Sequence, residues 1–196
     1  MTNQLRISEK STGFTLIELI VTLTVAAILM AAAAPSFREL IQSNRLTASV
    51  NELSGSINMA RSEAVKRGRR VVVCKSSNGN DCVTTSSTFW QQGWIIFVDD
   101  NNDAVHDAGE ELLRVHDALE RNVTLTGNGN VANYISYISE GRAQLTDGTS
   151  QSGTINACLY CADLCKQDPP WEGRDLELTF AGRLDINGGT CTCTCP

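Results

Sequence analysis

The sequence predicts an α+β fold in which one long N-terminal helix packs on antiparallel β-sheets. An apolar segment near the N-terminus leads into a stretch whose apolar residues recur with helical spacing, up to residue 67. From residue 68 onward, short β-prone runs alternate with turn signals. With 196 residues, the chain has room for one soluble domain and a membrane segment.

The N-terminus combines a polar block, residues 1–13, with an apolar segment, residues 14–37, in which Glu18 is the one ionisable side chain. About 20 apolar residues in a helix span a bilayer, so we expect residues 14–37 to cross a membrane. Basic side chains in the polar block favour a cytoplasmic N-terminus. A charge within such a segment is costly and usually functional. The alternative is a secretory signal peptide cleaved near residues 31–34.

Residues 38–67 are predicted to continue this helix in amphipathic form. Apolar residues there recur at alternating spacings of four and three: Leu46, Val50, Leu53, Ile57, Ala60 and Ala64. Such a stripe is one face of a helix, and we expect it to pack on the chain's own domain. Gly68 is a typical helix stop. The basic residues around it suit either a helix C-terminus or contact with DNA: Lys66, Arg67, Arg69 and Arg70.

Residues 68–196 are predicted to form a β-rich globular domain outside the cytoplasm. The expected strands are 71–74, 94–98, 112–115, 123–125, 134–138, 154–159 and 176–180. Turn signals at 78–79, 127–129 and 187–189 separate them. Residues 71–196 carry seven basic and 17 acidic side chains, a net charge of −10. This balance disfavours a dominant nucleic-acid role for the domain.

The cysteines indicate disulfides formed in an oxidising compartment, because their number is even and their surroundings are rich in turns. They are Cys74, Cys82, Cys158, Cys161, Cys165, Cys191, Cys193 and Cys195. Cys74 and Cys82 flank a turn, which favours a hairpin disulfide. The remaining cysteines form two clusters, and we favour disulfides between the clusters. A zinc site with four thiolates is the alternative.

One acidic segment follows the spacing of a calcium-binding loop, with Val105 at the carbonyl position. Its oxygen ligands would be Asp99, Asn101, Asp103, Asp107 and Glu110. Ala104 stands where such loops have glycine, so the alternative is an acidic hairpin tip. We expect no other cofactor. His106 and His116 are the only histidines, and no nucleophile–base arrangement is recognisable, so we expect no enzyme activity.

Residues 13–19, Gly-Phe-Thr-Leu-Ile-Glu-Leu, resemble the cleavage motif of type IV pilins and type II secretion pseudopilins. The resemblance implies that residues 1–13 are a leader, cut off after Gly13 by a prepilin peptidase that methylates Phe14. It also implies that Glu18 pairs with the terminal amine of a neighbouring subunit during assembly. The resulting protein would be a single-pass protein of the inner membrane with a periplasmic domain, and would later enter a filament.

Further segments resemble the GspH/FimT/FimU group of minor pilins and pseudopilins. They are residues 59–68, 93–99, 107–110 and 112–114 and the pairs Gly141-Arg142 and Gly182-Arg183. The resemblance implies a pilin-like fold and a role in initiating or capping a type IV pilus or a type II secretion pseudopilus. The partners would be other pilins or pseudopilins, contacted through the N-terminal helix near the filament tip.

The same resemblance raises an alternative function in DNA uptake. Some FimT-type minor pilins bind DNA through a Gly-Arg-x-Arg motif near the C-terminus. Here the matching residues are Gly182-Arg183-Leu184-Asp185, so an aspartate replaces the second arginine. Arg142 and Arg183 are candidates for one phosphate contact each, and Asp185 together with the acidic domain disfavours this function.

Overall fold

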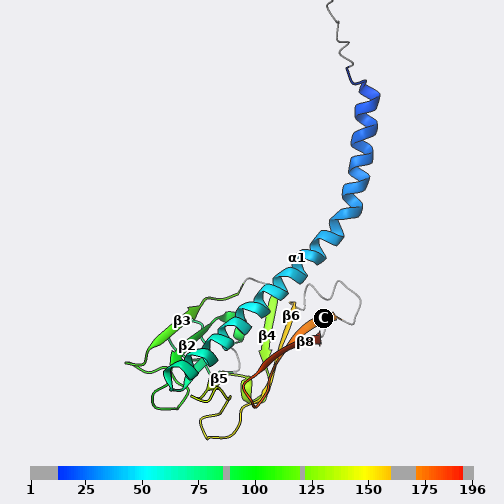
Figure 1. Ribbon diagram of the computed structural model, residues 1–196. Coiled ribbons are helices and arrows are strands. Elements are labelled where there is room, and N and C mark those ends of the chain that lie inside the picture. Colours follow the sequence, from blue (N-terminus) through cyan, green and yellow to red (C-terminus); the bar gives the residue numbers. More distant parts are fainter. Residues whose placement is uncertain (1–12, 86–88, 120–121, 160–170, 192–196) are drawn as a thin grey trace, which may run out of the picture. The chain divides into compact units, whose positions relative to one another are not determined.

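The computed structural model describes residues 13–85, 89–119, 122–159 and 171–191. The chain divides into two compact units, Met1–Ile41 and Gln42–Pro196. One helix, α1 (Leu16–Arg67), supplies residues to both, and every strand belongs to the second unit (Figure 1).

In the first unit, local sequence explains where α1 begins. The hydroxyl oxygen of Thr15, just before the helix, accepts a hydrogen bond from the backbone N–H of Glu18 at 3.3 Å. A threonine before the first turn with a glutamate three residues later is a typical N-terminal capping pattern. The Glu18 carboxylate also lies in the first turn, where the helix dipole favours negative charge.

The first unit exposes apolar side chains on every side of the helix. Those with large exposed areas include Phe14, Leu16, Ile17, Leu19, Leu23, Ile28, Leu29 and Met30. The hydroxyls of Thr22 and Thr24 donate to the carbonyls of Leu19 and Val21, so their polar groups are satisfied within the helix. Within the part of the chain that the structure describes, no helix meets the length and apolarity needed to cross a membrane.

Among the described residues of the second unit, eight strands form two antiparallel sheets. The first sheet has the order β3-β2-β1-β5, with β3 (Leu112–His116), β2 (Trp94–Val98), β1 (Val71–Lys75) and β5 (Tyr134–Tyr137). The second has the order β4-β6-β7-β8, with β4 (Val123–Gly127), β6 (Gly153–Leu159), β7 (Trp171–Leu178) and β8 (Leu184–Cys191). The second unit also contains two short 3-10 helices, η1 (Trp90–Gln92) and η2 (Gly129–Val131). The α+β prediction is confirmed.

The predicted apolar stripe of α1 lies in the main hydrophobic core. All six of its residues are buried, and they share one cluster with residues of both sheets, such as Trp94 and Leu125. The helix ends at Arg67 because Gly68 adopts a positive φ of 65°. The N–H groups of Gly68 and Arg69 then both donate to the Ala64 carbonyl, which combines the 5→1 bond of an αL cap with the 6→1 bond of a Schellman motif.

The first sheet is covered on both faces, which explains the unbroken apolar runs of β1 and β2. Val71 and Val73 point into the main core beneath α1. Val72 and its neighbour on the same face, Cys74, belong to a second cluster on the opposite side. Ala104 contributes to that second cluster, so the segment after β2 folds over the outer face of the sheet.

The turn predicted at 187–189 is wrong, because these residues lie within β8. They pair with residues 173–175 of β7, opposite one another in antiparallel register. A Cβ on Gly189 would lie 2.3 Å from a carboxylate oxygen of Asp175, so a side chain at this position would force that carboxylate to move. The sequence reads as a turn because Asn-Gly-Gly is a local turn signal, whereas here all three residues continue an extended strand that is paired with β7.

A disulfide joins Cys158 of β6 to Cys191 of β8, across the intervening strand β7. The Cα atoms of the two cysteines are 5.8 Å apart. Gly173 lies beneath the bridge, since a Cβ at that position would be 2.6 Å from the Cys191 sulfur and 2.9 Å from the Ala157 carbonyl oxygen. The strand can pass under the disulfide only without a side chain at this point.

We therefore expect Gly173→Ala to destabilise the protein by about 1–3 kcal/mol, the usual cost of forcing extra atoms into a packed site. The matched control is Gly188→Ala in the same hairpin, because nothing lies within 4 Å of a Cβ there. Thermal unfolding of both variants under non-reducing conditions measures the difference. Equal melting temperatures for the two variants would contradict this account of Gly173.

Candidate functional site

The N-terminal candidate residues lie at the start of the first unit. Gly13 and Phe14 precede the helix, and Phe14 is 83% exposed. Glu18 lies one turn further on and is also exposed. The peptide bond between Gly13 and Phe14 is thus on open backbone outside any helix or strand, next to an uncovered apolar helix. Residues 1–12 of the predicted leader lie outside the described residues.

The acidic segment between β2 and β3 folds around Asp99. Asp99 is 1% exposed. One of its carboxylate oxygens accepts the backbone N–H groups of Asn102 and Asp103, at 2.7 and 3.2 Å, and the other accepts that of Ala104 at 3.1 Å. Burial raises the pKa of Asp99, and these hydrogen bonds oppose that rise. The carboxylate therefore organises the turn from inside.

The other predicted calcium ligands bond to one another or to the backbone. The Asn101 amide donates to carboxylate oxygens of Asp103 and Asp107, at 3.0 and 2.9 Å. Glu110 accepts the backbone N–H groups of Asp100 and Asp107. Ala104 takes a positive φ of 60°, as the glycine of a calcium loop would. No cluster of three or more His, Cys, Asp or Glu side chains suited to a metal ion occurs among the described residues. Calcium binding stays a prediction.

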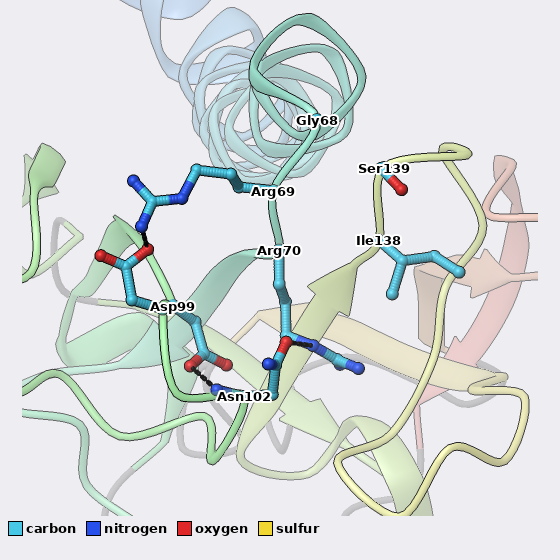
Figure 2. Close-up of a pocket in the computed structure, with 8 residues that line it drawn as sticks. Gly68, Arg69, Arg70, Asp99, Asn102, Ile138 and Ser139 are labelled. Atoms are coloured by element: carbon cyan, nitrogen blue, oxygen red, sulfur yellow. Dashed lines mark hydrogen bonds and ion pairs between the residues drawn. The ribbon is translucent and has the colours of Figure 1, made fainter.

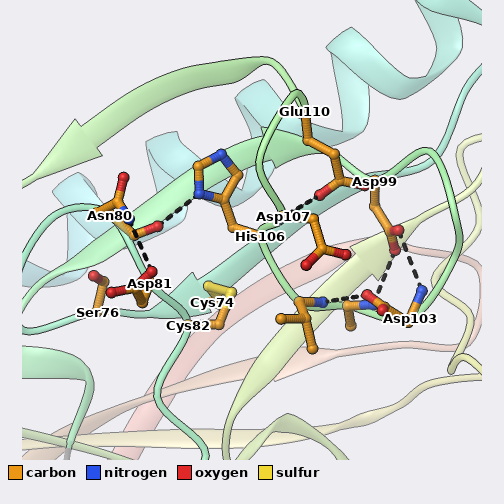
Figure 3. The surroundings of a disulfide bond; sticks show 12 residues. Cys74, Ser76, Asn80, Asp81, Cys82, Asp99, Asp103, His106, Asp107 and Glu110 are labelled. Carbon is orange, nitrogen blue, oxygen red and sulfur yellow. Dashed lines mark hydrogen bonds between the residues drawn. A yellow bond between two sulfur atoms is a disulfide. The ribbon is translucent and has the colours of Figure 1, made fainter.

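A second loop, closed by the disulfide Cys74–Cys82, packs beside this acidic segment (Figure 3). His106 connects the two loops: its Nδ1 lies 2.7 Å from the Asn80 carbonyl oxygen, and its ring meets the edge of Phe97. Both loops thereby cover the outer face of the first sheet. Of the remaining predicted disulfide cysteines, Cys161, Cys165, Cys193 and Cys195 lie outside the described residues.

The basic residues after α1 line a pocket of about 290 Å³ at the end of the helix (Figure 2). Arg69 forms an ion pair with Asp100. Arg70 is 8% exposed, and its guanidinium donates to the Asn102 side chain at 3.0 Å and to the Gln144 carbonyl oxygen at 2.9 Å. Arg69 and Arg70, two of the four basic residues that suggested DNA contact, are thus engaged in holding loops to the helix end.

The two Gly-Arg pairs lie on two turns that touch each other. A Cβ on Gly182 would be only 2.4 Å from the Gly141 carbonyl oxygen. Both arginines, Arg142 and Arg183, are exposed. Arg183 Nε donates to the Asp185 carboxylate at 2.8 Å, so the aspartate that replaces an arginine in the sequence motif also neutralises its neighbour.

Arg61 of α1 holds both of these turns, and sequence reasoning missed it. Its Nε donates to the Gly141 carbonyl oxygen at 2.9 Å, and its Nη2 donates to that of Ala181 at 3.2 Å. The acceptors are backbone atoms 80 and 120 residues further along the chain. No local pattern marks such a contact, because the partners are not identified by side-chain type.

Two family models match the chain. The model described as type II transport protein GspH matches residues 49–182, and the prokaryotic N-terminal methylation motif matches residues 10–34. The first match covers the stripe of α1 from Val50 onward and most of both sheets. The second covers the Gly13–Phe14 bond and Glu18.

Solved structures show a similar fold. The type IV minor pilin FimU of Pseudomonas aeruginosa, in space group P21, superposes with a TM-score of 0.52 at 20% identity, over 74% of this chain and 90% of that chain. A second crystal form of the same pilin gives a TM-score of 0.49 at 20% identity, over 72% and 91% of the two chains. No curated protein matches the sequence.

Proposed function

Because this chain belongs to the GspH family of minor pilins and pseudopilins, we propose that it helps to initiate or cap a pilin-type filament. The filament is a type IV pilus or a type II secretion pseudopilus. The role is structural rather than catalytic. Residues 14–37 anchor the protein in the inner membrane, residues 38–67 continue the helix, and residues 68–196 form the domain outside the cytoplasm.

The uncovered apolar helix of the first unit supports this proposal most directly. A helix that is apolar on all sides requires an apolar surrounding, either lipid or other helices. In the described residues 14–31, Glu18 is the one ionisable group, and no ion pair within the described chain involves it. An unpaired carboxylate in such a surrounding is expensive, so a partner with a positive charge is required.

The N-terminal amine of a neighbouring subunit suits this requirement. Cleavage between Gly13 and Phe14 by a prepilin peptidase would create such an amine on Phe14. Phe14 would then be the first residue of the chain and Glu18 the fifth. Each subunit would then carry one positive and one negative group at the start of its helix. Pairing between subunits stabilises both charges in a low-dielectric bundle, where either one alone is costly.

The disulfides support a location outside the cytoplasm. Bonds such as Cys74–Cys82 and Cys158–Cys191 persist in the bacterial periplasm and are rare in the reducing cytosol. Together with an anchor at the N-terminus, they favour a protein whose domain faces the periplasm until the subunit enters the filament.

A DNA-binding role in natural transformation is the second candidate. It is favoured by one observation, the contact between the two turns that carry Arg142 and Arg183. Two exposed guanidiniums on adjoining turns suit two phosphates of one strand. The ion pair between Arg183 and Asp185 and the acidic charge of the domain count against this role.

The function is tested with a strain that lacks this chain, scored for twitching, protein secretion and DNA uptake together. We expect loss of twitching if the filament is a pilus, or loss of secretion if it is a pseudopilus, with complementation by the full chain. Loss of DNA uptake alone, with filaments and twitching intact, would favour the second candidate. Normal behaviour in all three assays would contradict both candidates.

A further inference from the structure

A turn between β7 and β8 presents an aromatic side chain to solvent. Phe180 is 69% exposed, the largest exposed fraction of any aromatic ring in the described part of residues 42–196. Val65 of α1, 55% exposed, lies next to the adjoining turn, because a Cβ on Gly141 would be 3.0 Å from its side chain. With Arg142 and Arg183 these residues form a mixed surface that we call the Gly-Arg face.

The Gly-Arg face is held rigidly from below. Besides the two hydrogen bonds from Arg61, the hydroxyl of Tyr137 donates to the Gly182 carbonyl oxygen at 3.2 Å. Burial raises the pKa of this hydroxyl well above its usual range, so it remains a neutral donor. Within the turn, the N–H of Gly182 donates to the Thr179 carbonyl at 2.8 Å. A surface ordered in advance loses little conformational entropy when a partner binds.

Its charge balance is far less acidic than that of the surrounding domain. Three guanidiniums, those of Arg61, Arg142 and Arg183, lie on these turns or beneath them, and the neighbouring carboxylates are those of Glu140, Asp185 and, opposite Asp185 on β7, Glu177. Residues 71–196 as a whole carry a net charge of −10. Arginine and aromatic residues are enriched in protein interfaces, and arginine is one of the residues that most often contribute strongly to their binding energy.

We propose that the Gly-Arg face docks onto an acidic surface of the adjacent pilin-type subunit, with Phe180 as its apolar anchor. This inference rests on the proposed function, because it requires the chain to enter a filament. Complementary charge selects the partner and its orientation. A protein partner is favoured over DNA because the exposed side chains of Phe180 and Val65 suit an apolar contact, and because the strongly acidic domain around the face would repel a polyanion along its length.

The test replaces Phe180 in the full-length chain by the photo-cross-linking residue p-benzoylphenylalanine, in cells that assemble filaments. We expect a cross-link to an acidic segment of a subunit that carries an N-terminal methylation motif, identified by mass spectrometry. Phe89 is the matched control position, since it is another exposed phenylalanine of the domain. With the photo-cross-linking residue at position 89 instead of 180, the yield of the same cross-link should be at least about fivefold lower. The reason is that only a side chain at the centre of the interface stays in contact with the partner.

Charge reversal then separates docking from chance proximity. Arg142→Glu and Arg183→Glu should each reduce the cross-link from position 180 about fivefold or more, whereas Arg114→Glu on the exposed edge strand β3 should leave it unchanged.

A nuclease-sensitive product would overturn the proposal in favour of DNA. Absence of the cross-link, with the chain present in sheared filaments, would overturn the docking alone. Absence of the chain from filaments and their assembly sites would overturn the proposed function as well.

Discussion

Replacing Asp99 by alanine is expected to lower the free energy of unfolding by about 2–5 kcal/mol, one of the largest effects of any single change in the domain. The substitution removes the acceptor of three backbone N–H groups, those of Asn102, Asp103 and Ala104. Ala104 is buried against the outer face of the first sheet, so water cannot easily replace the lost acceptor. Chemical denaturation of the purified protein measures the loss.

Two further variants make the result specific. Asp99→Asn keeps one oxygen acceptor and should lose less stability than the alanine variant. Asp107→Ala should cost less than about 1 kcal/mol, since that exposed carboxylate receives only the Asn101 amide from a side chain. Equal losses at positions 99 and 107 would contradict the internal role of Asp99. A rise in melting temperature on addition of calcium to the wild-type protein would show that the loop also binds the ion.

The pH dependence of the Asp99 effect has a definite sign. Burial raises the pKa of this carboxyl in the folded protein above its ordinary value of 3.8, so the folded state binds the proton more tightly than the unfolded state does. The contribution of this titration to stability is therefore fully present below pH 3.8 and is lost as pH rises through the folded pKa. The stability difference between wild type and Asp99→Ala should grow as pH falls through that window.

Replacing Glu18 by valine is expected to remove the chain from filaments without unfolding its domain. In the proposed filament, the substitution would leave the terminal amine of the neighbouring subunit without its partner in an apolar bundle, where breaking a buried pair costs about 3–5 kcal/mol. Such a cost corresponds to a loss of roughly a hundredfold or more in the amount incorporated. Quantifying the chain in sheared filaments against the membrane fraction measures this effect.

The matched control for Glu18→Val is Thr22→Val, one helical turn further along. Thr22 donates only to the Leu19 carbonyl within its own helix, so valine should preserve incorporation. The domain should keep its melting temperature in both variants, because the buried core begins at Leu46. Mass spectrometry should still find a methylated Phe14 at the N-terminus. Normal incorporation of the Glu18 variant would refute the pairing between subunits.

Local patterns in the sequence were sufficient for the features that depend on near neighbours. The stripe that contains Leu53 and the helix stop at Gly68 each act within a few residues. The alternation of β-prone runs and turns was enough to indicate an α+β fold. The residues around Gly13 indicated the family, because the N-terminal methylation motif is a short linear pattern.

Tertiary structure alone decided the features that join distant segments. It showed that the glycines at 188 and 189 lie in a strand, since both pair in antiparallel register with residues of β7. It paired Cys158 with Cys191 across β7, and it placed the backbone acceptors of Arg61 on two turns that touch. Sequence determines which short-range conformations and charges are available, whereas contacts over 80 or more residues depend on how the packed sheets and helix bring the chain together.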